Sequence, residues 1–302
     1  MAEVHHFTYG AFNPVAAYLL AFLGSFLGLL STERARAART RGRRNRWLII
    51  AAFSIGGGAI WLMHFTAMLG FDVPDSPVRY NAVLTMLSLG LAVVTVGIGL
   101  IVVGHGKHSP TRTAVAGTIT GLGVLAMHYT GMIGMHVAGT IHYRPALVIA
   151  SGLIAIVAAT VALWFTVAVR GWGPILGAAA IMAVAVCGMH YTGMASMEVR
   201  LDPMDFGHVI GLHPLLMILP ITVITSATIL GVALSALQAM TEEEFTNGDG
   251  IPRRGVHAEH PWSLKQASLA AIRRTPSPRP SPRPAAPRSY PTGEALQSAG
   301  RP

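Results

Sequence analysis

Seven long apolar segments constrain this chain more than any other feature. Each is long enough to cross a lipid bilayer, which takes about 20 residues as a helix. Only 12% of the residues are charged, against about 25% in an ordinary soluble domain. We therefore predict an all-α polytopic protein of the cell (plasma) membrane, embedded in the lipid bilayer. Its seven predicted transmembrane helices are 13–30, 47–71, 80–104, 113–136, 145–169, 174–197 and 214–240.

Basic residues gather in the segment between the first two predicted spans. Residues 31–47 hold seven arginines and one glutamate, whereas the segments on the opposite side carry more acidic residues. Because Lys and Arg are enriched in cytoplasmic loops, we predict that the N-terminus lies outside the cytoplasm and the C-terminus inside. The same rule accounts for the formal net charge of +9, so we expect no nucleic-acid partner.

The composition changes sharply after residue 240. Residues 241–302 are rich in proline and arginine and poor in apolar side chains, and such a segment cannot bury enough apolar surface to fold. We therefore predict a membrane domain at 1–240 and a disordered Pro/Arg-rich cytoplasmic tail at 241–302. We see no catalytic motif there and predict no enzyme, although redox activity is not excluded. A signal would then leave through a cytoplasmic partner bound to the inner loops or the tail.

A ten-residue motif occurs three times within the membrane domain. The copies are LMHFTAMLGF from Leu62, AMHYTGMIGM from Ala126 and GMHYTGMASM from Gly188, and their histidines are 64 and 62 residues apart. This separation matches two spans with their loops, and each copy ends an even-numbered span. We therefore predict three two-helix repeats plus one further helix, with all motifs near the outer membrane face. Membrane folds often use such repeats to build a shared central site.

Each motif places a histidine and methionines on one face of a helix, because residues at i, i+4 and i+7 share a face. Ionisable side chains inside a membrane indicate a functional site, and imidazole with thioether sulfur suits copper. We therefore predict a copper site shared by three helices. Cys187 lies one turn before its histidine and is a further candidate ligand. The three stripes are His64, Met68 and Phe71; His128, Met132 and Met135; and His190, Met194 and Met197.

The three M-H-[YF]-T-x-M segments on alternate helices resemble the MHYT domain of bacterial integral-membrane sensor proteins. The resemblance covers residues 7–240. It implies a sensor of a diatomic gas (oxygen, carbon monoxide or nitric oxide) or of redox state, acting through copper near the outer membrane face. It also implies that the methionine before each histidine is a ligand, although helical geometry alone favours a packing role for that methionine. The implied ligands are Met63, His64, Met68, Met127, His128, Met132, Met189, His190 and Met194.

Two features depart from this resemblance. Phe65 replaces the tyrosine found at Tyr129 and Tyr191, so a role that depends on the tyrosine hydroxyl is not threefold. Family members often carry cytoplasmic cyclase, phosphodiesterase, kinase or DNA-binding modules, and we expect none in these 302 residues. The sequence therefore predicts a stand-alone membrane sensor.

Two other functions stay open at this point. A copper channel or carrier would use methionine and histidine as successive weak sites, and Met86 and Met182 lie toward the inner face. A membrane redox protein would instead hold haem between facing histidines. Three equivalent histidines at one depth favour a shared three-coordinate site over a haem with two axial ligands.

Overall fold

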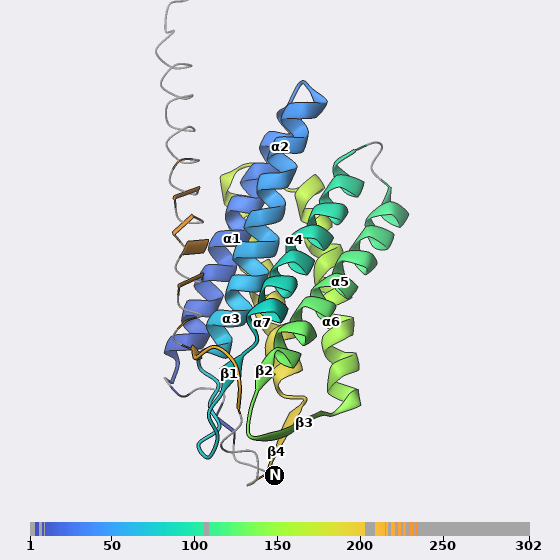
Figure 1. Cartoon of the computed structure of the whole chain (residues 1–302). Coiled ribbons are helices and arrows are strands. Elements are labelled where there is room, and N and C mark those ends of the chain that lie inside the picture. Colours follow the sequence, from blue (N-terminus) through green and yellow to red (C-terminus); the bar gives the residue numbers. More distant parts are fainter. Residues whose placement is uncertain are drawn as a thin grey trace, which may run out of the picture. The chain divides into compact units, whose positions relative to one another are not determined.

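The computed structural model describes residues 10–105, 109–202 and 209–214, with a few further residues before 10 and between 216 and 234 (Figure 1). Contacts divide the chain into two units, Met1–Gly248 and Asp249–Pro302, and every described residue belongs to the first. The predicted tail lies outside the described residues, so its disorder stays a prediction. The predicted seventh span is described only at some of its residues, which are helical.

Helices dominate the described part of the chain. Five are long and apolar enough to cross a membrane, because continuous apolar runs of this length have few alternatives in lipid. A further helix, α5, has similar length, but its Thr, Gly, His and Tyr residues make it less apolar. The segments are α1 (Phe12–Ala37), α2 (Arg41–Ala52), η1 (Phe53–Leu62), α3 (Met63–Met68), α4 (Ala82–Gly104), α5 (Pro110–Ile133), α6 (Pro145–Ala168) and α7 (Trp172–Met194).

Among the described residues, the helices contact one another in chain order and close into a ring; Figure 1 shows this bundle from the side. α4 packs against η1 and α5, α6 packs against α5 and α7, and α1 closes the ring between α7 and η1. Small residues permit these close approaches, as is usual in membrane helix pairs. A Cβ atom on Gly24 of α1, for example, would lie 2.4 Å from the backbone nitrogen of Ala59. Three two-helix units therefore surround one centre.

The second span is one continuous helix whose middle is not α-helical. The π-helix η1 separates α2 from α3 and contains three consecutive glycines. Neighbouring backbone lies very close there, since a Cβ atom on Gly56 would be 2.7 Å from the carbonyl oxygen of Ala92 on α4. π segments are rare and occur frequently at functional sites. This one ends two residues before His64 and has no counterpart in α5 or α7.

The predicted helix ends were wrong in opposite directions at the two ends of the bundle. At the motif end, the helices stop three residues early, at Met68, Ile133 and Met194. At the other end, α1 continues to Ala37 and α2 begins at Arg41, so most of the predicted arginine loop is helical. Alanine and arginine are strong helix formers, which explains the second difference.

Short antiparallel strand pairs close each two-helix unit at the motif end, and the all-α prediction missed them. In the second and third units, the strand before the first helix pairs with the strand after the second helix. In the first unit, His5 and Asp72 form the equivalent bridge through two 2.9 Å hydrogen bonds. The paired strands are β1 (Arg79–Tyr80) with β2 (Met135–His136), and β3 (Gly139–Tyr143) with β4 (Met197–Leu201).

Candidate metal centre

The three motif histidines meet inside the bundle. His64 on α3, His128 on α5 and His190 on α7 lie with their ring centroids 4.9 to 5.2 Å apart. All three are buried, with at most 1% of each residue exposed. Ring closure of the three units explains this meeting, because each unit delivers one histidine from the same position near the end of its second helix.

One nitrogen from each imidazole points to a common centre. The Nδ1 atom of His64 lies 3.0 Å from Nδ1 of His190 and 3.2 Å from Nδ1 of His128, and the three ligand atoms all lie within 4.8 Å of one another. Metal–nitrogen bonds of about 2.0 Å place three ligands of one ion about 3.5 Å apart. The group contains no carboxylate, so the donor set is neutral and fits a soft ion such as Cu(I).

Hydrogen bonds between the imidazoles cannot satisfy all three Nδ1 atoms. A neutral imidazole has one donor nitrogen and one acceptor nitrogen. Nδ1 of His64 faces two other Nδ1 atoms, so a shared hydrogen bond from this one atom is the best that the three rings can form. A cation at the centre would instead accept all three lone pairs. The close approach of the three Nδ1 atoms therefore favours a metal.

Glycine provides the space for two of the rings. A Cβ atom on Gly131 would lie 2.5 Å from Nε2 of His64, and one on Gly193 would lie 2.3 Å from Nε2 of His128. Each ring therefore rests against the glycine of the next repeat. Both Nε2 atoms are buried and have no hydrogen-bond partner among the described residues. Metal-bound histidines usually donate this second N–H to an oxygen, so the centre departs from the usual surroundings of a metal ligand.

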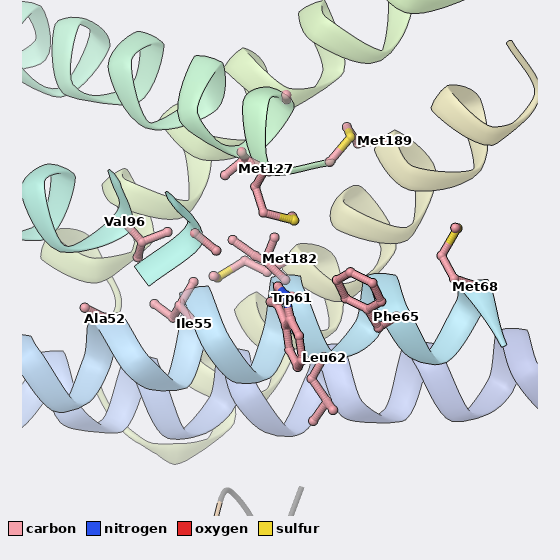
Figure 2. Packing of buried hydrophobic residues seen from close by; sticks show 14 of the residues in the cluster. Ala52, Ile55, Trp61, Leu62, Phe65, Met68, Val96, Met127, Met182 and Met189 are labelled. Carbon is pink, nitrogen blue, oxygen red and sulfur yellow. The ribbon is translucent and has the colours of Figure 1, made fainter. Parts of the chain in front are cut away.

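The six methionines of the M-H-[YF]-T-x-M segments are all buried within the bundle. Met63 packs with small residues, among them Ala17 and Ala183, on the side facing α1 and α7, which agrees with a packing role. Figure 2 shows the side chain of Met127 directed into the bundle toward Met182. Ligation by the sulfur atoms stays a prediction. The remaining motif methionines, in the main hydrophobic cluster, are Met68, Met132, Met189 and Met194.

The helical stripe does not extend to the last methionine of the second and third motifs. Met135 and Met197 follow the helix ends and lie in β2 and β4, where they pair with Tyr80 and Tyr143. The helical spacing that predicted their place on the histidine face therefore does not apply to them. Cys187 is absent from the group of close ligand atoms in the described chain, and it packs against the small-residue cluster beside α1.

The aromatic residue after each histidine differs in its surroundings. Phe65 packs between the rings of Trp61 and Tyr80, where a hydroxyl group is not required. Tyr129 instead makes a 3.1 Å hydrogen bond with Ser151, and its ring contacts Tyr143 on β3. Burial, with a smaller contribution from Tyr129, raises the pKa of Tyr143 to about 12, so this phenol is neutral at physiological pH.

An apolar cavity of about 60 Å³ lies within the bundle. Its wall includes Ile60, Val124 and Val186, each one helical turn before a motif histidine. Sequence reasoning missed this cavity, although a β-branched residue four positions before every histidine was a visible signal. The three repeats thus build a histidine layer and, beneath it, an apolar layer.

Comparisons with known proteins agree with the threefold organisation. The family model MHYT, described as "Bacterial signalling protein N terminal repeat", matches residues 57–116, 121–179 and 184–245. Each match begins shortly before a motif and includes the next membrane segment, so α1 lies outside the matched repeats. Each sequence repeat thus pairs a motif helix with the helix that follows it. The strand pairs instead join each motif helix to the helix before it: α1 with α3, α4 with α5 and α6 with α7.

The chain is also similar to three curated signalling proteins. It is 37% identical to the bifunctional diguanylate cyclase/cyclic di-GMP phosphodiesterase MucR of Pseudomonas aeruginosa over 236 residues, which are 74% of this chain and 34% of MucR. It is 36% identical over 196 residues to the cyclic di-GMP phosphodiesterase NbdA of the same organism, covering 63% of this chain and 24% of NbdA. It is 29% identical over 204 residues to the signaling protein YkoW of Bacillus subtilis, covering 65% and 25%. The chain thus spans about a third or less of these relatives, and no solved structure matches it.

Proposed function

Because this chain belongs to the MHYT family of bacterial signalling proteins, we propose that it is a membrane sensor that binds copper at His64, His128 and His190. The observation that carries the proposal is the convergence of three buried Nδ1 atoms. Thioether groups from the same motifs supply a soft environment, which favours Cu(I). When bound, copper supplies a coordination position and a change of oxidation state, and the protein holds it in a site without charged ligands.

The sensed molecule in this proposal is a diatomic gas: oxygen, carbon monoxide or nitric oxide. The apolar cavity supports it, because apolar cavities stay dry and accept small apolar molecules. A cavity of about 60 Å³ is too small for a porphyrin, so the structure does not favour the haem alternative. Met182 and Met189 line the cavity, but the other lining residues are mostly aliphatic, which does not favour a series of cation sites for a copper carrier.

We place the domain in the plasma membrane with seven spans, the N-terminus outside and the C-terminus in the cytoplasm. The apolar helices support the membrane location, and the arginines where α1 ends and α2 begins support the orientation, because basic residues are retained in the cytoplasm. The histidine site then lies nearer the outer face. Binding there has to favour one of two helix arrangements if a signal is to cross the membrane.

The output of this sensor is proposed to pass to a cytoplasmic signalling partner. The matched region is the signalling repeat, and the enzymatic activities named for MucR and NbdA belong to proteins that are about three times longer or more than the matched region. A partner that contacts the inner loops or the tail would receive the change in helix packing. Because two relatives are named as enzymes of cyclic di-GMP metabolism, we propose that this partner acts on cyclic di-GMP.

Metal analysis tests the proposal directly. We expect the protein purified in detergent to retain copper, His128→Ala to lose it, and His142→Ala to keep it, since His142 is an exposed histidine on β3. Equal copper in all three proteins would sink the copper site. An absorption band typical of haem in the wild type would favour the redox alternative, and copper flux into proteoliposomes that His128→Ala abolishes would favour the carrier.

A further inference from the structure

A second hollow lies at the end of the bundle opposite the histidines. Its volume is about 280 Å³, and residues from α1, α2, α4, α6 and the α6–α7 connection line it. Three arginines, Arg36, Arg44 and Arg170, form its polar wall. Buried apolar side chains, including Leu48 and Leu100, form its floor. The retention of arginine on the cytoplasmic side explains the charge of this end, but not the gathering of three guanidinium groups around one space.

The protein fixes one of these arginines firmly. Arg36 donates hydrogen bonds to the carbonyl oxygens of Thr166 and Val169, the latter at 2.6 Å. These carbonyls lie at the C-terminal end of α6, where backbone acceptors lack helical partners. Arg36 therefore ends α6 and at the same time holds its positive charge at the wall of the hollow.

The other two arginines have capacity for a ligand. Nε of Arg44 is buried and has no hydrogen-bond partner among the described residues, and a buried donor without a partner is costly. Arg170 is exposed at the end of the α6–α7 connection and lies close enough to Arg36 for the two charges to repel. An anion within the hollow would relieve both conditions.

The nearby acidic group does not fill this role. Glu33 interacts with Arg36, but its carboxylate accepts a 3.0 Å hydrogen bond from the backbone N–H of Gly171 and does not line the hollow. Three guanidinium groups thus face one carboxylate. Guanidinium groups match the oxygen geometry of phosphate and bind it through paired hydrogen bonds.

We propose that this hollow is a binding site for a phosphate group, carried by an anionic lipid headgroup or by a soluble phosphate compound. Basic pockets between membrane helices on the cytoplasmic side are suited to phospholipid headgroups, and the apolar floor provides a surface for the carbon chain next to the phosphate. Leu100 and Thr166 line both this hollow and the cavity beneath the histidines. A ligand at the arginine end therefore contacts the wall of the apolar cavity.

Binding measurements on the full chain test this site with two probes. One arm titrates inorganic phosphate into lipid-free protein in a neutral detergent. The other compares nanodiscs of phosphatidylcholine with nanodiscs that contain increasing phosphatidylglycerol, and both arms follow the thermal unfolding temperature. Stabilisation by phosphate identifies a soluble ligand, and stabilisation by phosphatidylglycerol alone identifies a lipid headgroup. Stabilisation by neither probe would overturn the proposal.

Matched variants separate the hollow from general surface charge. We expect Arg44→Gln with Arg170→Gln to weaken binding of the active probe by on the order of tenfold or more, since hydrogen bonds to charged groups are the stronger ones. Arg39→Gln with Arg46→Gln removes the same charge from exposed positions of the same basic segment and should change binding less than about twofold. Equal losses in the two pairs would refute a specific site. Arg170→Gln alone, at an exposed position, gives the same test if the double variant does not fold.

Discussion

The two ends of the bundle use ionisable residues in opposite ways. At the motif end, three histidines from three repeats are buried and point at one centre. At the other end, three arginines come from α1, α2 and a connection and surround an open hollow. The first arrangement follows the threefold repetition of the fold, whereas the second uses two arginines of the first unit and one of the third. Repeated residues therefore build the central histidine site, and non-repeated residues build the arginine hollow at the opposite end.

The largest expected effect comes from a substitution that disrupts the histidine site and leaves the arginine hollow intact. Gly193→Ala places a Cβ atom 2.3 Å from Nε2 of His128, so the ring must leave its position and copper should be lost. Overpacking of this kind costs about 1–3 kcal/mol of unfolding free energy. Metal analysis and thermal unfolding measure both effects, while phosphate binding at the arginine end should be unchanged.

A neighbouring glycine provides the control for this substitution. Gly188 lies five residues earlier on α7, and a Cβ atom there would meet nothing within 4 Å. Gly188→Ala should therefore keep its copper and gain slightly in helix stability. Loss of copper from both variants would mean that α7 tolerates no added methyl group, and retention in both would mean that the ring does not need the glycine.

Acid should weaken binding at the histidine end only, and salt should weaken binding at the arginine end only. Imidazole must be deprotonated to bind a metal, and its charge ordinarily changes between about pH 5 and 8, so acidification should release copper. Guanidinium stays charged throughout this range, and phosphate binding at the arginine end should persist while the phosphate remains ionised. Added salt should weaken phosphate binding at the exposed rim and leave buried copper in place. Copper content and unfolding temperature, measured across both titrations, test these opposite responses. Parallel responses of the two ends would contradict the prediction.

The sequence predicts the histidine site better than the arginine hollow, for a physical reason. Repetition at a spacing of two spans places His64, His128 and His190 at one depth whatever the details of packing. The positive-inside rule assigns the arginines to one side of the membrane without saying which of them face inward. That choice depends on the helical extension of α1 and on the start of α2 at Arg41, and both lie where the sequence predicts a loop.

Other features escaped prediction because they depend on contacts between distant segments. An apolar run that leaves a helix and enters a strand looks like a longer helix, so Met135 and Met197 were assigned to helices. Their strand partners, Tyr80 and Tyr143, lie more than fifty residues away. The π-helix lies where α1 and α4 approach η1 closely. The apolar cavity, in contrast, has a repeated signal in the sequence, the β-branched residue four positions before each histidine.

A smaller effect is expected in the cavity that separates the two ends. Ala159→Val adds volume to the cavity wall, so copper should remain bound while carbon monoxide reaches the reduced centre more slowly. Ala126→Val is the control, since Ala126 is exposed and lies two residues before His128. Infrared or stopped-flow detection of carbon monoxide binding measures the rate. Equal rates in the two variants would remove the cavity from the proposed gas path.

The smallest expected effect tests how much asymmetry the motif end tolerates. Ser151 donates its hydroxyl proton to the carbonyl oxygen of Val148 at 2.8 Å, so Tyr129 acts as the donor in its 3.1 Å contact with Ser151. Tyr129→Phe should cost about 1 kcal/mol of unfolding free energy and leave copper bound, because Phe65 already occupies the equivalent place in the first motif. Ser151→Ala should cost a similar amount, and the double variant little more than either. Loss of copper from Tyr129→Phe would instead assign the hydroxyl to the metal centre and make the first repeat the functional exception.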